Sequence, residues 1–441
     1  MQIDVLVCSC GCTLDDVIDT KSLIEFSQKL ENVRSAALHP FLCHEDGLEK
    51  LKAAMRRKPD GVVVAACSRY LSFPLFEEAA LQVGMSPHQI ELVNIREYCA
   101  WVHRDQKKDA SSKAKRMLYA GVKRASKLKP IEVRQYRVTD KALVVGAGIA
   151  GLQSSLDLAN QGFKVFLLEA SPMIAGNTYR LYSVYPQDCL ATCLLGSSIT
   201  QTLAHPNIEL ISYADVTGVQ PYAGGFKVTI SVKPRYVKIE RCRGCGLCAE
   251  QCPVKVPNEL DGGLTFRKAI YKPHEKAIPD KYLIDPANCL RFQGRECNFC
   301  ESVCPMAAID FQERSEERMV DVGAVILSTG FDEFDYAGVS PFSGLQSGYA
   351  ISQIQLSALL DPMGPTRGEL SRPADFRRPR SVAMVQCVGS REVYPGTNPY
   401  CSQYCCMAAF KNAAFIRTRY PDMDVTLIAK DITTGGKGFE Q

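Results

Sequence analysis

Apolar and polar positions alternate in a regular way over the first 130 residues. Short runs rich in β-branched residues are typical of buried strands and occur at residues 3–7, 61–66 and 90–94. Apolar positions with helical spacing occur at residues 22–30 and 47–57, and again within the basic segment 107–129. This order predicts a small α/β domain over residues 1–135.

A second pattern combines a strand, a glycine-rich turn, a helix and another strand within residues 141–169. Gly146 permits a tight turn, Gly148 lets a pyrophosphate approach the backbone, and Gly151 allows the helix to pack closely on the strand. Glu169 closes the second strand, where an acid hydrogen-bonds the ribose of an adenine dinucleotide. A purely structural glycine turn would not require the acid in this register, so the pattern predicts an adenine dinucleotide site.

Strand patterns continue after this motif and are interrupted by a cysteine-rich stretch. Short strands are expected within residues 207–232, and one buried strand is expected at 320–327, leading to Gly330 and Asp332 as further candidates for cofactor binding. The simplest topology is one dinucleotide-binding domain with an insertion. We therefore predict its first part at residues 136–234, the insert at 235–311, its second part at 312–380, and a partial second nucleotide-like domain at 381–441.

The cysteine-rich insert carries the strongest signal in the chain. It contains two runs that each end in Cys-Pro: Cys242-x2-Cys245-x2-Cys248-x3-Cys252-Pro253 and Cys289-x7-Cys297-x2-Cys300-x3-Cys304-Pro305. This is the bacterial ferredoxin pattern for two cubane clusters, in which the fourth cysteine of each run ligates the other cluster. The predicted sets are Cys242, Cys245, Cys248 and Cys304 for one cluster, and Cys289, Cys297, Cys300 and Cys252 for the other.

Zinc is the alternative metal for such a stretch, because Cys-x2-Cys pairs also suit tetrahedral zinc. Two zinc sites would need only two close pairs each. They would account neither for the third close cysteine nor for the repeated Cys-Pro. The gap of seven residues between Cys289 and Cys297 predicts a longer loop at that position.

Cysteines also follow the expected strands of the first domain. Ligands collect beyond the carboxyl ends of parallel strands, so these thiols are expected to converge at one edge of the sheet. The convergence suggests a further [4Fe-4S] cluster held by Cys10, Cys43, Cys67 and Cys99, with Cys8 or Cys12 as substitutes. The alternative is that these cysteines are small buried hydrophobic residues.

The last 60 residues hold four more cysteines in a spacing that fits no zinc finger. Cys387 lies at the end of a strand expected at residues 381–388, and Cys401, Cys405 and Cys406 lie at the start of a helical pattern at 407–419. One cysteine at a strand end facing three at a helix start can surround a cubane, whose negative charge the helix dipole favours. Structural thiols are the alternative. A second GxGxxG, expected here in an oxidoreductase with two dinucleotide sites, is missing.

Composition excludes several classes of function. A net charge of +4, from 52 basic and 48 acidic residues among 441, does not indicate nucleic-acid binding. No signal peptide and no apolar run of about 20 residues is evident, so a cytoplasmic protein without a membrane span is expected. Twenty cysteines in such a protein indicate metal or redox chemistry, and oxygen-sensitive clusters would favour an anaerobic host.

These features together resemble the HdrA family, the iron–sulfur flavoprotein component of heterodisulfide reductase, over essentially all 441 residues. Besides both Cys-Pro runs and the glycine turn, the resemblance includes Cys8-Ser-Cys10-Gly, Ala65-Ala-Cys67-Ser, Asn94-Ile-Arg96-Glu97-Tyr-Cys99-Ala-Trp101-Val-His103, Gln386-Cys387-Val-Gly-Ser390 and Asn398-Pro-Tyr-Cys401-x3-Cys405-Cys406-Met407. It implies FAD in a thioredoxin-reductase-like Rossmann domain, an inserted bacterial-type ferredoxin domain and an N-terminal α/β iron–sulfur domain. It also implies that Cys387, Cys401, Cys405 and Cys406, and the set Cys10, Cys43, Cys67 and Cys99, are cluster ligands.

The sequence departs from the family pattern in two places. Family members commonly continue past the point that corresponds to Gly435–Phe439 with the rest of the second nucleotide-like domain and a further ferredoxin domain. Either a separate subunit supplies these parts, or the chain represents a shortened branch in which bifurcation is weakened or lost. The family's Cys-x2-Cys appears here as Cys189-x3-Cys193, which we expect to be structural or redox-active thiols near the flavin.

The resemblance implies an oxidoreductase that works within a complex. The expected function is electron transfer, including bifurcation or confurcation, between a two-electron donor, ferredoxin or another one-electron carrier, and a partner reductase subunit. The flavin itself is expected to be the reactive group, since no acid–base or nucleophile constellation is evident. The alternative is a wiring subunit that relays electrons without substrate chemistry, and a nicotinamide:ferredoxin oxidoreductase comes third.

Overall fold

The computed structural model describes residues 1–131, 134–185, 189–336 and 348–439. The chain forms two compact units, Met1–Gln135 and Tyr136–Gln441.

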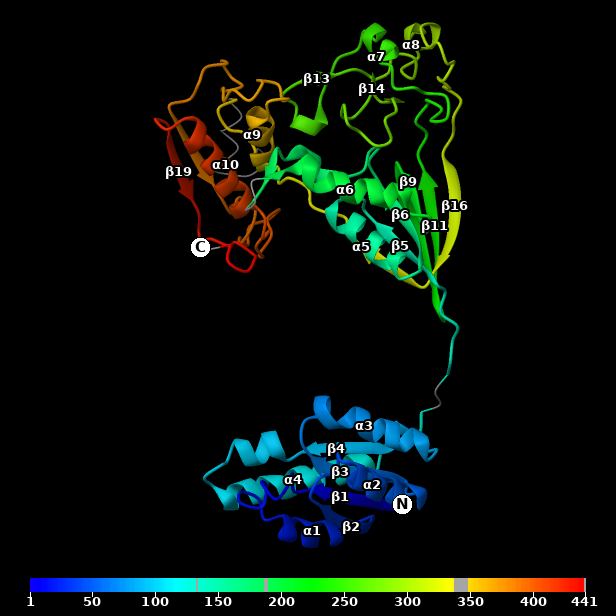
Figure 1. Ribbon diagram of the computed structural model, residues 1–441, viewed down its shortest axis with the longest axis vertical. Helices are drawn as coiled ribbons and strands as arrows, with labels where there is room; N and C mark the ends of the chain where they lie inside the picture. Colours follow the sequence, from blue (N-terminus) through cyan, green and yellow to red (C-terminus); the bar gives the residue numbers. More distant parts are fainter. Residues whose placement is uncertain (132–133, 186–188, 337–347, 440–441) are drawn as a thin grey trace. The chain divides into compact units, whose positions relative to one another are not determined.

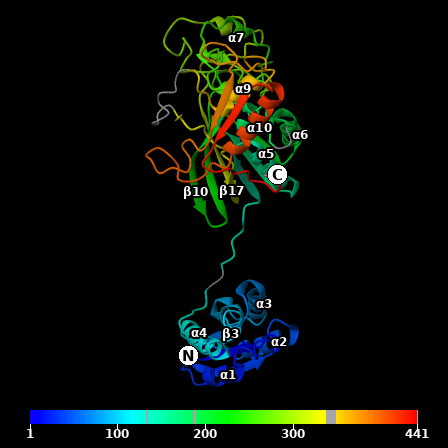
Figure 2. The same cartoon turned by 90° about the vertical axis from the view of Figure 1, so that its left-hand side faces the viewer.

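The first unit is a parallel four-stranded sheet with helices on both faces (Figure 2). The sheet has the order β2-β1-β3-β4, formed by Val33–His39, Ile3–Cys8, Gly61–Ala66 and Ile90–Asn94. Helices α1 (Thr20–Gln28) and α4 (Lys107–Ala125) pack together on one face, and α2 (Glu45–Arg56) and α3 (Arg69–Gln82) on the other. The sequence pattern missed β2 because this outer strand is only partly buried and carries Arg34, Ser35 and His39.

The second unit is built on another parallel sheet, with the order β17-β5-β6-β9. Figure 1 labels three of its strands, β5, β6 and β9. Its strands are Ala324–Leu327, Lys141–Val145, Lys164–Glu169 and Ile208–Ser212. Helices α5 (Ile149–Asn160) and α6 (Ala191–Ala204) cover one face through Leu152, Leu195 and Ile199. An antiparallel sheet of β10 (Ala214–Tyr222), β11 (Gly225–Val232) and β16 (Glu316–Val322) covers the other face.

The single strand expected at residues 320–327 is wrong, because the structure divides it between two sheets. β16 ends at Val322 in the antiparallel sheet, and β17 begins at Ala324 in the parallel sheet. Gly323 makes the change of sheet possible, since a Cβ at this position would lie 2.2 Å from the backbone oxygen of Thr139. The apolar stretch that follows Asp321 hid this division, because it continues across Gly323 from the end of β16 (EERMVDV) into β17 (AVIL), and β17 is only partly buried.

The cysteine-rich segment lies between β11 and β16, which pair with each other along their whole length. The segment contains two short helices, α7 (Leu247–Gln251) and α8 (Phe299–Ser302), which Figure 1 shows beside each other at its far end. It also contains the short strand pairs β12–β13 (Val256–Pro257 with Phe266–Arg267) and β14–β15 (Ile270–Tyr271 with Leu283–Ile284). Buried Arg235 joins it to the parallel sheet by donating to the Pro172 oxygen and to Ser212 Oγ.

The last part of the chain pairs two parallel strands, β18 (Ser381–Val385) and β19 (Asp424–Ile428), connected by α10 (Cys405–Arg419). Helix α9 (Gln353–Leu360) packs on α10 through a cluster that includes Leu359, Ala409 and Ile416. The strand expected at residues 381–388 therefore ends three residues early. Among the described residues, no helix is long and apolar enough to cross a membrane.

Candidate functional site

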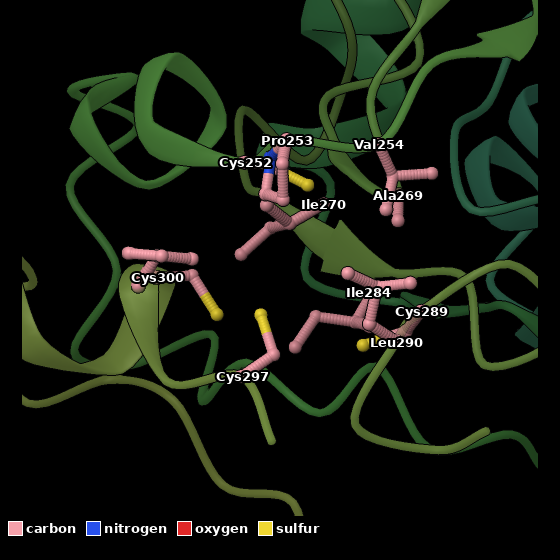
Figure 3. Close-up of a pocket in the computed structure, with 11 residues that line it drawn as sticks. Cys252, Pro253, Val254, Ala269, Ile270, Ile284, Cys289, Leu290, Cys297 and Cys300 are labelled. Carbon is pink, nitrogen blue, oxygen red and sulfur yellow. The ribbon is translucent and has the colours of Figure 1, made fainter. Parts of the chain in front are cut away.

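The insert encloses two cavities, and each is lined by four cysteines. One cavity is lined by Cys242, Cys245, Cys248 and Cys304, and the other by Cys252, Cys289, Cys297 and Cys300. These are the two sets predicted from the Cys-Pro runs, including the exchange of the fourth cysteine. In Figure 3 the sulfur atoms of Cys297 and Cys300 point toward a common space, with Cys252 and Cys289 on further sides of it.

Tight turns and short helices direct these thiols inward. Gly244 and Gly246 have φ angles of +68° and +88°, which only glycine adopts without strain, and they separate the first three cysteines of the first run. α7 and α8 then carry one cysteine of each cavity, Cys248 and Cys300. Within the described residues, no three His, Cys, Asp or Glu side chains are close enough to share a single metal ion.

One thiol of each cavity lies in surroundings that oppose a free negative charge. Burial raises the pKa of Cys248 to about 12 and that of Cys300 to about 11, and the neighbouring cysteines add to both effects. Two lysines compensate on the outside, since Lys281 donates to the backbone oxygen of Cys242 and Lys268 to that of Cys252. Thiolates here therefore need a positive group inside the cavity, such as the iron of a cluster.

The glycine turn after β5 has the geometry of a phosphate-binding turn. Gly146 has a φ of +103°, and a Cβ there would lie 2.2 Å from the Ser328 oxygen. A Cβ on Gly151 would lie 1.8 Å from the Gly146 oxygen, so only glycine lets α5 pack this closely on the turn. A Cβ on Gly148, in contrast, would meet no atom within 4 Å. The turn thus presents open space at the N-terminus of α5, where an anion is favoured.

Glu169 ends β6 directly beside this turn. Its carboxylate is buried and accepts hydrogen bonds from the backbone N–H groups of Ala147, at 2.7 Å, and Ser171, at 2.8 Å. Gly330 and Asp332 lie in the loop that follows β17, and Gly330 has a φ of +72°. Asn177, which sequence reasoning missed, donates to the backbone oxygen of Phe331 in this loop.

Three of the four cysteines of the last region, Cys387, Cys405 and Cys406, are neighbours. Cys387 directly follows the β18 region with a φ of +62°, and Cys405 and Cys406 begin α10. Burial raises the pKa of Cys406, and Cys405 and Cys387 raise it further, which shows that these three thiols are neighbours. Cys401 Sγ accepts from the Gln403 N–H at 3.3 Å, two residues before Cys405.

Side chains connect the loop after β17, called the dinucleotide loop below, to the insert and to the Cys387–Cys406 region. The ring of Phe331 lies 4.5 Å from the ring of Tyr404, which precedes Cys405. Arg180 donates to the Leu260 oxygen in the insert at 3.0 Å and forms an ion pair with Glu333 at 2.9 Å. Sequence reasoning missed these residues because no spacing rule brings such distant segments together.

The first unit places its candidate ligands less uniformly. Cys8 interacts electrostatically with Cys10 and Cys43. Arg96 Nη1 lies 3.4 Å from Cys10 Sγ, and Arg96 also interacts with Cys67. Three of the four predicted residues therefore share an edge of the sheet.

Cys99, the fourth candidate of this set, is fully buried. Its Sγ lies 3.5 Å from Met117 Sδ, in the core beneath α4. Burial raises the pKa of this thiol. Cys8 interacts with Cys10 and Cys43, whereas Cys99 contacts Met117 in the core. The choice between Cys8 and Cys99 as the fourth ligand stays a prediction.

Cys189 and Cys193 lie at the start of α6. Cys189 belongs to the short strand β8 (Cys189–Leu190) and Cys193 is exposed in the first turn of the helix. All 20 cysteines are free thiols in the structure.

Comparison with known proteins identifies both the fold and the family. Residues 144–208 match the NAD(P)-binding Rossmann-like domain model, which confirms the α/β Rossmann prediction. A thioredoxin reductase from Lactococcus lactis aligns over 20% of this chain and 29% of its own, with 20% identity. The TM-score of 0.18 is too low to support a conclusion about the fold.

The curated relatives align over the whole of this chain. The iron–sulfur A-subunit of CoB–CoM heterodisulfide reductase from Methanocaldococcus jannaschii is 39% identical over 441 residues. The A-subunit of the H2:CoB-CoM heterodisulfide,ferredoxin reductase from Methanothermobacter marburgensis is 39% identical over 446 residues. The chain covers 66% of the length of each. The chain belongs to the HdrA family, the iron–sulfur A-subunits of heterodisulfide reductase.

Proposed function

We propose that this chain is the flavin- and iron–sulfur-containing electron-transfer subunit of a heterodisulfide-reductase-like complex. The observation that carries the proposal is the pair of insert cavities, each lined by four thiols in the crossed grouping of two cubane clusters. Four thiols per cavity match the ligand requirement of one iron–sulfur cluster each.

FAD is the dinucleotide we propose for the glycine turn. The open face of Gly148 and the amides at the start of α5 fit a pyrophosphate, and we assign Glu169, which ends β6 beside this turn, to the ribose. When bound, FAD supplies the exchange between two-electron and one-electron transfer, and the clusters supply one-electron transfer. Gly330 and Asp332 would complete the site from the loop after β17.

Side-chain contacts join the insert and the Cys387–Cys406 region to the loop after β17. Arg180 fastens the insert to the dinucleotide loop, and the Phe331–Tyr404 contact fastens the loop to the Cys387–Cys406 region. We propose a third cluster at Cys387, Cys401, Cys405 and Cys406, and a fourth at the Cys10, Cys43 and Cys67 edge with Cys99 or Cys8. A flavin with cluster branches on several sides is suited to bifurcation or confurcation with a ferredoxin-type carrier and a partner reductase subunit.

Free thiols and clusters require a reducing compartment, so we propose a cytoplasmic location. Anaerobic mixing of the purified chain with reduced ferredoxin, a dithiol or reduced nicotinamide tests the function. Reduction by ferredoxin and not by nicotinamide is the expected result. Rapid reduction by nicotinamide would instead favour a nicotinamide:ferredoxin oxidoreductase, and substrate turnover by the isolated chain would argue against a role confined to a complex.

A further inference from the structure

The two cysteine-lined cavities of the insert differ in their remaining wall residues. Apart from its cysteines, the Cys289 cavity is lined only by apolar residues: Pro253, Val254, Ala269, Ile270, Ile284, Leu290 and Phe299. The Cys242 cavity adds a phenol and a guanidinium, from Tyr282 and Arg243. Arg243 belongs to the first Cys-Pro run, but Tyr282 lies between the two runs in sequence, so their spacing does not predict its place in the wall.

The Tyr282 hydroxyl is directed at the first cysteine run. A Cβ on Gly246 would lie 3.2 Å from the Tyr282 oxygen, so the hydroxyl lies against the turn between Cys245 and Cys248. Tyr282 also interacts electrostatically with Cys242, Cys245 and Cys248. Among the described residues this hydroxyl makes no hydrogen bond to a cysteine, so it is free to donate to a sulfur atom of a cluster bound in the cavity that it lines.

Other charged groups near the insert do not cancel this difference. Lys281 and Lys268 occupy equivalent places, one behind each cavity. Asp280 lies against Gly244 near the Cys242 cavity, but its carboxylate is paired with Lys272 at 2.9 Å. Cys304 in this cavity also accepts the Ala308 N–H at 3.3 Å.

We propose that Tyr282 makes the two cluster sites unequal, so that the Cys242, Cys245, Cys248 and Cys304 site is the more easily reduced. This inference rests on the proposed function. A reduced cluster carries one more negative charge, and hydrogen bonds to its sulfurs stabilise that charge, whereas an apolar wall does not. The step is the arrival of one electron from a ferredoxin-type donor, with no bond made or broken. Tyr282 itself gains and loses no electron, and it affects the cluster only through a hydrogen bond to sulfur.

The test is an anaerobic dithionite titration of the full chain, followed by electron paramagnetic resonance. Y282F removes the hydroxyl and keeps the ring. We expect the equilibrium constant for reduction of the Cys242 site to fall about three- to tenfold, or about 30 to 59 mV for a one-electron couple. Y271F is the matched control, because Tyr271 lies in the same β14–β15 pair and lines neither cavity.

Variants that keep only one of the two insert clusters show which electron paramagnetic resonance signal belongs to which site. Y282F should lower the potential in a C300A background, which keeps the Cys242 site, and leave it unchanged in a C248A background. If the cysteine variants lose all iron, Y282F in the otherwise unchanged chain still gives the answer. Equal shifts at both sites, or none at the Cys242 site, overturn the inference and leave the proposed function intact. Protein without iron and sulfide overturns both.

Discussion

The ring of Phe331 lies 4.5 Å from the ring of Tyr404, at an interplanar angle of 38°. Phe331 belongs to the loop that follows the dinucleotide sheet, and Tyr404 lies between Cys401 and Cys405. The contact therefore joins the dinucleotide site to the last cysteine region. The Tyr404 hydroxyl is buried and has no hydrogen-bond partner among the described residues.

This contact predicts that two substitutions at Tyr404 change the free energy of unfolding by different amounts. Y404F removes a buried unpaired hydroxyl and keeps the ring, so the free energy of unfolding should stay within about 1 kcal/mol of the original value or rise. Y404A removes the ring contact and should cost about 2 to 4 kcal/mol. Urea unfolding followed by flavin absorbance checks both. A Y404F variant as unstable as Y404A would contradict the described packing.

The crossed cysteine grouping predicts a specific pattern in double variants. C252A and C300A affect the same cavity, so C252A/C300A should lose one cluster, or about 4 iron atoms. C252A and C248A affect different cavities, so C252A/C248A should lose both clusters, or about 8.

Iron and sulfide analysis of anaerobically purified protein measures these losses. C304A/C248A serves as the matched pair for the other cavity and should again lose about 4 iron atoms. If C252A/C248A lost only one cluster, each cysteine run would hold its own cluster and the crossed grouping would be wrong.

The open space at Gly148 predicts that binding can be lost without loss of the fold. Gly148 has a φ of −74°, which alanine adopts readily, and its Cβ would meet no protein atom within 4 Å. G148A should therefore keep the stability of the apoprotein within about 0.5 kcal/mol. The added methyl group would occupy the place of the pyrophosphate, so FAD affinity should fall at least about tenfold.

Calorimetric titration of the apoprotein with FAD provides the measurement for G148A. G196A is the control, since Gly196 lies in α6 and its Cβ would also meet no atom within 4 Å. This substitution should stabilise the helix by up to about 1 kcal/mol and leave FAD affinity unchanged. Unchanged affinity in G148A would argue against a phosphate at this turn.

Asp4 predicts a loss of stability in acid. Burial alone would raise the pKa of Asp4, but hydrogen bonds from Arg34 and Ser35 and the charges of Arg34 and Arg57 lower it overall. A carboxylate with a lowered pKa contributes stability above its unfolded pKa of about 3.9, and this contribution disappears as the pH falls through the folded pKa. D4N should thus cost about 1 to 3 kcal/mol at neutral pH and reduce the loss of stability below about pH 4.

Amide hydrogen exchange of strands β1 to β4, measured by mass spectrometry, reports on unfolding of the first unit. D16N is the control for D4N, because Asp16 is exposed. An acid dependence identical in D4N and the original chain would show that Asp4 does not titrate with folding.

The sequence predicted most where chemistry imposes a fixed spacing. The Cys-Pro runs require certain turns around a cluster, so the grouping of Cys252 with Cys289 followed from spacing alone. The glycine turn at Gly146 was predictable for the same reason. Periodicity failed at Gly323, where one apolar run serves two sheets, and at the partly polar strand β2.

Contacts between distant segments lay beyond sequence reasoning. Tyr282 reaches the first cysteine run, and Arg180 reaches the insert, only because the fold brings their elements together. No spacing rule relates such residues. The position of Cys99 beside Met117 likewise depends on how α4 packs on the sheet.

The most direct test of the account is the iron, sulfide, zinc and FAD content of the anaerobically purified chain. Four cubane clusters predict about 16 iron atoms per FAD, and the insert alone predicts about 8. A value near 16 would support clusters at the Cys387–Cys406 region and the first unit as well as in the insert. A value near 8 would reduce the account to a flavin with the two insert clusters. Zinc in place of iron would contradict it.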